Sequence, residues 1–268
     1  MALDPLRDVI ARHGLATRKS LGQHFLLDGN LLARIVRVAG PLAGVNVIEV
    51  GPGPGGLTRA ILDTEAAHIT AIEVDPRAIA ATSELLAVAG GRLDVVAGDA
   101  LAIDLRAITD APRIIIANLP YNAGTAMLVR WLHQAADFQA MVLMFQHEVA
   151  ERIIAAPGTP HYGRLAVLAA LTVDGSIAMS VPAAAFSPPP KVESAVVRLI
   201  PHPTQPTPAL LTRVGTVTAA AFGQRRKMLR GSLKSLGGAN LLNRVGIDPE
   251  RRAETLTPAE YVRLAEAL

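Results

Sequence analysis

The sequence predicts an α/β protein in which a doubly wound parallel sheet is followed by a small helical domain. The sheet is predicted because short apolar runs recur up to residue 200 and helical patterns separate most of them. The helical domain is predicted because Pro201, Pro203, Pro206 and Pro208 mark a boundary that no strand pattern follows. We therefore expect a tail over 1–19, an α/β domain over 20–203 and a helical domain over 204–268.

Each expected strand is a short apolar run bounded by Gly, Pro or polar residues. The expected strands cover 45–50, 68–74, 93–97, 114–117, 140–145, 176–181 and 194–200. The expected helices cover 57–62, a segment opened by Pro76, 124–133, 146–155, and short stretches within 210–236 and 241–268. The last two strands flank a proline-rich segment, and we expect them to add an antiparallel edge to the sheet.

Composition excludes several classes of protein. The chain has no cysteine, which excludes disulfides, thiolate metal sites and a cysteine nucleophile. No apolar stretch reaches the roughly 18 residues of a membrane span. Residues 1–19 also lack the apolar core of a secretory signal. We therefore expect a soluble, cytoplasmic protein without a membrane partner.

The positive charge is concentrated in the last quarter of the chain. Residues 204–268 contain 10 Lys and Arg against 5 Asp and Glu, whereas residues 1–203 contain 16 against 18. This asymmetry indicates a polyanionic partner for the helical domain. A solvated helix face explains the charge alone equally well.

A glycine-rich turn follows the first expected strand. Gly51, Gly53 and Gly56 match the pattern G-x-G-x-x-G, which on its own is a weak nucleotide-binding signal. Glu73 ends the second strand, where a carboxylate can bind two ribose hydroxyls. Asp99 follows the third strand at the same edge of the sheet, where it can accept a hydrogen bond from an adenine amino group.

Glu49 distinguishes between two nucleotide-like ligands. It lies inside the strand, two residues before the glycine turn. A nearby carboxylate would repel a pyrophosphate bound at the turn. S-adenosylmethionine, in contrast, carries a positively charged sulfonium and an ammonium group. The sequence therefore favours the methyl donor over NAD, although Glu49 can also simply orient the glycine turn through hydrogen bonds.

The tetrapeptide Asn118-Leu119-Pro120-Tyr121 follows the strand expected at 114–117. The Asn118 side-chain oxygen and the Leu119 carbonyl can each accept one N–H of a planar exocyclic amine. Pro120 stiffens the turn, and Tyr121 offers a flat face for a base. An ordinary Asn/Pro turn is the alternative for the tetrapeptide alone.

Taken together, several ordered motifs resemble those of the small-subunit (16S) rRNA adenine N6,N6-dimethyltransferases of the kasugamycin-sensitivity type. This family is related to the macrolide-resistance methylases of 23S rRNA. The motifs are KSLGQHFL at 19–26, EVGPG at 49–53, NLPYN at 118–122, YGRL at 162–165, FSPPPKVESAVVR at 186–198, FGQRRK at 222–227 and GIDP at 246–249. The last two resemble the housekeeping branch rather than the resistance branch.

The resemblance implies a Rossmann-like, seven-stranded, S-adenosylmethionine-dependent methyltransferase sheet with a C-terminal helical RNA-binding domain. It implies dimethylation of N6 on two adjacent adenosines of the 3′-terminal hairpin of 16S rRNA, within the small ribosomal subunit, by a monomer without a metal. The implied cofactor-binding residues are His24, Leu26, Glu49, Gly51, Gly53, Glu73, Asp99, Ala100 and Asn118. The implied catalytic residues are Asn118, Leu119, Pro120, Tyr121 and Phe186, with the two aromatic rings stacking on the base.

The RNA-binding residues that we expect are the cations of the helical domain, Arg225, Arg226, Lys227, Arg230 and Lys234, which are spaced partly at helical intervals. The chain departs from the family at Ala123-Gly124-Thr125, where many members have Ile-Ser-Thr, and at Pro54, where a bulkier residue is frequent. A ribosome-assembly factor on a methyltransferase scaffold, a 23S rRNA methylase and a nicotinamide oxidoreductase remain as alternatives.

Overall fold

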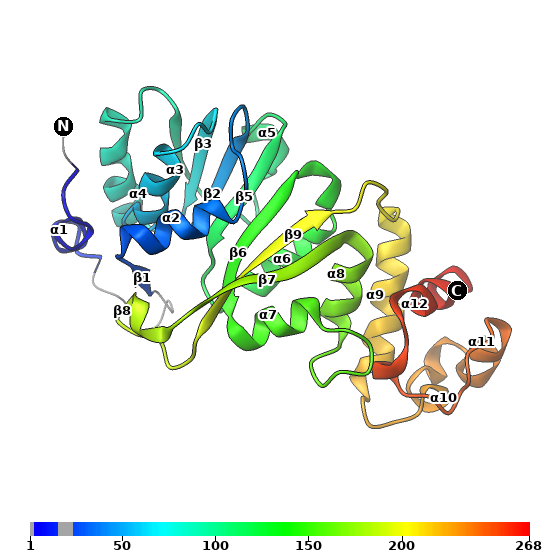
Figure 1. Ribbon diagram of the computed structural model, residues 1–268. Helices are drawn as coiled ribbons and strands as arrows, with labels where there is room; N and C mark the ends of the chain where they lie inside the picture. The colour runs from blue at the N-terminus through cyan, green and yellow to red at the C-terminus, as the bar shows by residue number, and fades with distance from the viewer. Residues whose placement is uncertain (1–2, 16–23) are drawn as a thin grey trace. The chain divides into compact units, whose positions relative to one another are not determined.

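The computed structural model describes residues 3–15 and 24–268 (Figure 1). Its strands are β1 Phe25–Leu26, β2 Asn46–Val50, β3 His68–Glu73, β4 Leu93–Ala97, β5 Arg113–Asn118, β6 Ala140–Gln146, β7 Val173–Val181, β8 Phe186–Ser187 and β9 Ser194–Pro201. Its α-helices are α1 Leu6–Arg12, α2 Gly29–Arg37, α3 Gly56–Leu62, α4 Pro76–Ser83, α5 Leu105–Ile108, α6 Gly124–Leu132, α7 His147–Ile154, α8 Arg164–Thr172, α9 Pro208–Gly223, α10 Leu229–Ser232, α11 Gly238–Arg244 and α12 Pro258–Glu266.

One seven-stranded sheet has the order β4-β3-β2-β5-β6-β9-β7. Strands β4, β3, β2, β5 and β6 are parallel, and β9 pairs antiparallel with β6. The predicted parallel sheet and its antiparallel addition are both confirmed. β7 begins at Val173, whereas the sequence predicts a strand from residue 176. The start of the strand is missed because Asp174 and Gly175 have low strand propensity.

The central strands of the sheet are buried on both faces. Helices α2 and α3 lie over one face of the sheet (Figure 1), where Val47, Ile69 and Ile114 pack in a single cluster with apolar residues of these helices. The alternate residues Ile48 and Ile115, which point to the other face, are fully buried as well. Continuous burial along a strand, rather than alternation, is typical of a parallel sheet that is covered on both sides.

Residues 6–12, which we expected within a tail, form helix α1. Val9 of this helix packs in a buried cluster with Phe25, Ala78 and Ala81. Arg12 is paired with Asp4 and Glu84 at 2.8 and 2.7 Å. The helix is therefore part of the packed α/β unit. Residues 1–2 and 16–19 of the expected tail lie outside the described residues.

The chain divides into two compact units. The first comprises 1–130, 136–150 and 176–200, and the second comprises 131–135, 151–175 and 201–268. The second unit is helical from 208 onward, as predicted, but it also takes in α8, which we did not predict. Its core contains the buried rings of Tyr162 and Tyr261. No helix among the described residues is long and apolar enough to cross a membrane.

Candidate active site

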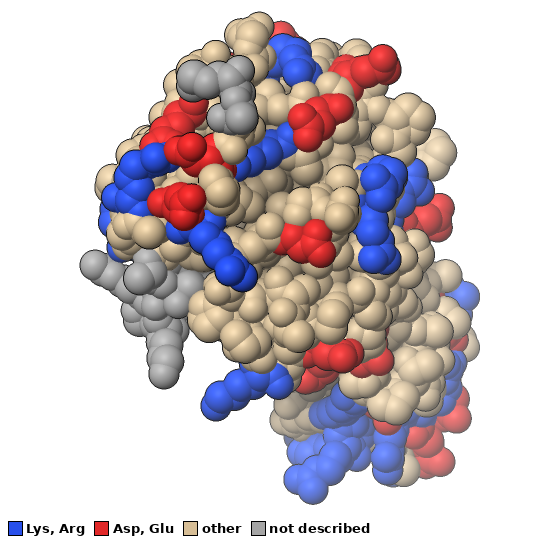
Figure 2. All heavy atoms as spheres, turned by 60° about the vertical axis from the view of Figure 1, so that its left-hand side comes forward, with Lys and Arg blue, Asp and Glu red and all other residues tan. Residues whose placement is uncertain are grey.

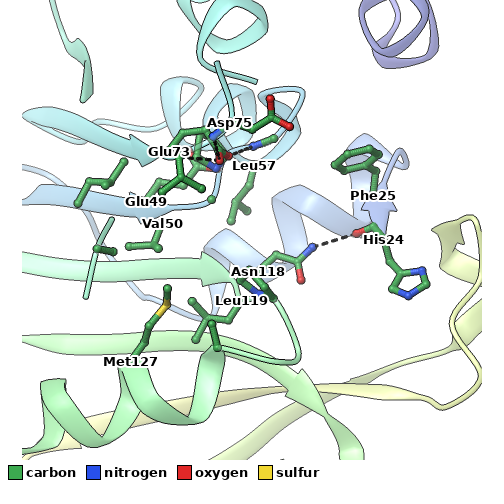
Figure 3. Close-up of a pocket in the computed structure, with 18 of the residues that line it drawn as sticks. His24, Phe25, Glu49, Val50, Leu57, Glu73, Asp75, Asn118, Leu119 and Met127 are labelled. Carbon is green, nitrogen blue, oxygen red and sulfur yellow. Dashed lines mark hydrogen bonds between the residues drawn. The ribbon is translucent and has the colours of Figure 1, made fainter. Parts of the chain in front are cut away.

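Loops at the carboxyl ends of β2, β3, β4 and β5 enclose a cavity of about 340 Å³. β2 and β5 are neighbours in the sheet, and the chain proceeds from β2 toward one edge and from β5 toward the other. Ligands of open α/β sheets bind at such a switch point. Figure 3 shows side chains from β2, β3 and β5 around this cavity.

The cavity brings together every residue that we expected at the cofactor and all but one of the expected catalytic residues. Those that line it are His24, Leu26, Glu49, Gly51, Gly53, Glu73, Asp99, Ala100, Asn118, Leu119, Pro120 and Tyr121. The exception is Phe186, which does not belong to the lining. The binding and catalytic roles of these residues remain predictions.

The glycine turn between β2 and α3 has a backbone that only glycine adopts readily. Gly51 and Gly53 have φ angles of 70° and 56°, in the left-handed region. A Cβ atom on Gly53 would also lie 3.0 Å from Cε1 of Phe25. The turn therefore keeps the cavity open close to the backbone, where a bulkier chain would fill it.

Two carboxylates occupy the edge of the sheet that we predicted for a ribose and an adenine. Glu73 is buried, and its Oε1 accepts the backbone N–H groups of Val74 and Asp75 at 2.8 and 3.0 Å. From the described part of the chain, its Oε2 accepts only the N–H of Gly53, at 3.3 Å, and it retains capacity for a ligand hydroxyl. Asp99 is exposed, and its Oδ1 accepts the N–H of Leu101 at 2.8 Å.

Glu49 is 1% exposed, and its Oε2 has no hydrogen-bond partner. Burial raises the pKa of Glu49 to about 8, an effect that the Thr58 side chain opposes and that the Glu73 carboxylate strengthens. The backbone of Thr58, in the helix that directly follows the glycine turn, also lowers the pKa of Glu49 by hydrogen bonding, which is compatible with the alternative orienting role. A buried carboxylate with one oxygen atom left without a partner is suited to a cationic ligand, which fits S-adenosylmethionine.

The turn after β5 presents acceptors to the cavity. Nδ2 of Asn118 donates to the carbonyl of His24 at 3.5 Å, and this bond leaves Oδ1 available (Figure 3). The Pro120 carbonyl accepts the N–H groups of Ala123 and Gly124 at 3.1 and 2.8 Å, which closes the turn. This closure holds despite the departure from the family sequence at Ala123-Gly124.

The two aromatic residues expected to stack on a base lie in different environments. Tyr121 is half-buried at the cavity, and its ring centroid is 5.7 Å from that of His24. Phe186 is only 4% exposed and belongs to the core of the sheet. Its strand β8 pairs with β1, and its ring contacts that of His24 edge-on at 6.4 Å. Its assignment as a stacking residue therefore has no support from this geometry.

The five cations expected to bind RNA are all exposed in the second unit. Arg225, Arg226 and Lys227 lie in the turn between α9 and α10, rather than on one helix as their spacing suggested. Arg225 donates to the Pro160 carbonyl at 2.7 Å, and Arg230 lies 3.5 Å from Glu250. Figure 2 shows blue Lys and Arg side chains gathered toward its lower end, with Asp and Glu nearby.

Sequence reasoning missed part of the lining. Phe25, Asp75 and Met127 also border the cavity. Phe25 and Met127 read as ordinary core residues, and Asp75 reads as the N-cap of α4, which it also is. The described residues contain no group of His, Cys, Asp and Glu that could hold a metal ion.

Comparisons with known proteins decide the family. The profile of the family described as ribosomal RNA adenine dimethylase matches residues 14–268. The chain belongs to this family. "Ribosomal RNA small subunit methyltransferase A" from Gluconobacter oxydans is 57% identical over 99% of the chain and 88% of its own length. The protein of the same name from Sinorhizobium medicae is 58% identical over 99% and 98%.

Solved structures agree with this assignment. A dimethyladenosine transferase from Plasmodium falciparum has a TM-score of 0.78 at 25% identity, over 90% of this chain and 96% of that one. The 23S rRNA methyltransferase ErmE has a TM-score of 0.68 at 27% identity, over 91% and 99%. This ribosomal RNA adenine dimethylase is therefore an S-adenosylmethionine-dependent enzyme with the Rossmann-like sheet that we predicted, and not a nicotinamide oxidoreductase.

Proposed function

We propose that this protein dimethylates N6 of two adjacent adenosines in the 3′-terminal hairpin of 16S rRNA, acting as a cytoplasmic monomer on the small ribosomal subunit. The observation that carries the proposal is the cavity itself. It combines a buried carboxylate that has one unpartnered oxygen atom, Oε2 of Glu49, with an acceptor-lined turn at Asn118, at one switch point of the sheet. When bound, S-adenosylmethionine would supply an electrophilic methyl group there. The N6–CH3 bond would form as the S–CH3 bond breaks, S-adenosylhomocysteine would leave, and the methylated amine would lose a proton to water, so the protein's own part is to present the adenine amine.

The N6 lone pair of adenine is delocalised into the ring, which makes the amine a poor nucleophile. Oδ1 of Asn118 and the carbonyl of Leu119 would accept the two N–H groups and favour a pyramidal nitrogen with an available lone pair. The ring of Tyr121 would replace the stacking that the base loses when it leaves the helix, which costs a few kcal/mol. Orientation of the amine supplies much of the remaining rate enhancement.

Two alternatives differ in substrate or in activity. Methylation of 23S rRNA is favoured less, because the relatives named for the small subunit are 57% and 58% identical, whereas ErmE is 27% identical. A purely binding role in ribosome assembly predicts RNA binding without methyl transfer. The arrangement of Asn118 and Tyr121 at the cavity argues against that role, although assembly and catalysis can coexist.

One assay separates these possibilities. The protein is incubated with labelled S-adenosylmethionine and unmodified small subunits, and in parallel with unmodified large subunits, after which N6-methylated adenosines are mapped. We expect two adjacent dimethylated adenosines near the 3′ end of 16S rRNA. Label confined to 23S rRNA would instead identify the resistance-type reaction, and binding without label would identify an assembly factor.

We also propose that the exposed cations of the second unit contact RNA phosphates. The side chains of Arg226, Lys227 and Lys234 make no hydrogen bond or ion pair with the residues that the structure describes, so they can bind phosphate without losing a partner. Replacing all three by Gln is expected to reduce the slope of log K against log salt by about 2 to 3, because each contact contributes about 0.7–0.9. Filter binding to small subunits at several salt concentrations measures the slope.

The matched control for this prediction is Arg263→Gln. Arg263 is an exposed cation on α12, in the same unit, and lies 3.9 Å from Glu260. We expect its replacement to leave the slope unchanged. If the triple variant also binds with the wild-type slope, then the three cations belong to a solvated surface.

A further inference from the structure

The Tyr121 hydroxyl forms a hydrogen bond with a buried serine, Ser194. The oxygen atoms of Tyr121 and Ser194 are 2.8 Å apart, and either can be the donor. Ser194 is 0% exposed and is the first residue of β9, where it pairs with Gln146 of β6. Among the described residues, each of the two hydroxyls forms a hydrogen bond only with the other.

This bond connects a turn to the sheet. Tyr121 lies in the turn after β5, outside any helix or strand, whereas β9 is held between β6 and β7. The hydroxyl is at the far end of the ring from the backbone, so a bond at that point fixes the direction in which the ring axis points. The ring of His24 is 5.7 Å from the same ring between centroids, with its plane tilted by 32°.

Stacking on a base requires only the face of an aromatic ring, which a phenylalanine also supplies. The hydroxyl of Tyr121 is therefore available for a different purpose. Burial raises the pKa of Tyr121, with the bond to Ser194 acting in the opposite direction, so the hydroxyl remains protonated near neutral pH. A buried serine hydroxyl without this partner would be left unsatisfied, which explains why the two groups occur together.

We propose that Ser194 is a positioning residue, which holds the Tyr121 ring in the orientation that presents the target adenine to Asn118. This inference rests on the proposed function, because it assigns Tyr121 to the base. Ser194 touches no reacting atom in this scheme and acts only through Tyr121. A small change in ring direction misaligns the amine, and misalignment of about 1 Å can cost on the order of a hundredfold in rate.

The test is a double-mutant cycle on methyl transfer to unmodified small subunits under single-turnover conditions. Ser194→Ala and Tyr121→Phe are each expected to lower the rate about tenfold, with the affinity for S-adenosylmethionine unchanged. The double variant is expected to be no slower than either single variant, because both remove the same bond. Tyr121→Phe keeps the packed ring, so it tests the bond even if Ser194→Ala folds poorly.

Thr70→Val is the matched control. The Thr70 hydroxyl is buried and bonded to that of Thr109 at 2.9 Å, but neither residue lines the cavity. We expect this variant to lose thermal stability and to keep the wild-type rate. Wild-type rates in both single variants, or losses that multiply in the double variant, would overturn the role of Ser194. A wild-type protein that transfers no methyl group contradicts the proposed function instead.

Discussion

Asn118→Ala is expected to lower the rate of methyl transfer about 10²- to 10³-fold, the loss typical of removing one preorganised polar group from a reacting centre. Asn118 ends β5, and its Oδ1 is the side-chain acceptor that the turn offers to an amine. Without it, the amine keeps its planar, delocalised geometry, and its lone pair does not point at the methyl donor. Single-turnover transfer to unmodified small subunits measures the effect.

The affinity of this variant for S-adenosylmethionine is expected to stay within about threefold of the wild type, a change of less than 1 kcal/mol. Asn118 is one of many residues around the cavity, and its side chain forms one hydrogen bond with the described residues, to the His24 carbonyl, which is long at 3.5 Å. Isothermal titration with the cofactor alone measures this quantity. The two measurements together separate loss of chemistry from loss of binding.

Asn46→Ala is the matched control. Asn46 begins β2 at the opposite end of the sheet, and its Nδ2 donates to the carbonyl of Asp110 at 2.9 Å. This variant therefore also loses an Asn side chain and a bond to a backbone carbonyl, but far from the cavity. We expect wild-type transfer from it. If Asn118→Ala transfers methyl groups as fast as Asn46→Ala, then Asn118 takes no part in the reaction.

The parallel sheet was predictable because its central strands are buried on both faces. Apolar runs such as 114–117 and 140–145 are continuous and end sharply, so their limits in the structure differ little from those expected. Strand β7 was only partly predictable, because most of its residues are exposed or half-buried and form no continuous apolar run. Helix α8 was missed because it is nearly apolar throughout, and helical periodicity is then lost.

The part of the site that was predictable consists of chemically reactive or polar residue types at the ends of predicted strands. Glu49, Glu73 and Asn118 each stand at the carboxyl end of a strand, and parallel strands bring those ends to one edge. The bond between Tyr121 and Ser194 was not predictable, since it joins residues that no local spacing relates. Phe186 shows the opposite case, in which a residue taken from the family motif is buried in the core.

Glu49→Gln is expected to weaken binding of S-adenosylmethionine about 30-fold near pH 8, because a buried charge pair typically contributes 2 kcal/mol or more to affinity. Gln has nearly the same shape as Glu but carries no charge for a cationic ligand. Glu65→Gln is the control, since Glu65 is exposed and lies outside the cavity. Titration calorimetry on the three proteins measures the difference, and equal affinities would remove Glu49 from the cofactor site.

The pH dependence of the affinity for S-adenosylmethionine tests whether the charge of Glu49 is the cause of this difference. With a pKa of about 8, the Glu49 carboxyl is mostly protonated below pH 7, and a bound cation favours its charged form. Binding to the wild type is therefore expected to weaken on acidification, approaching tenfold per pH unit below about pH 7, with release of a proton from Glu49. Glu49→Gln lacks this titration, and the ratio of the two affinities cancels protonation of the ligand's own amine. A ratio of affinities that stays constant between about pH 6 and pH 8 would contradict this expectation, because it means that Glu49 is already charged in the empty site. Desolvation of the Glu49 carboxyl would then be too weak to keep it protonated in this pH range.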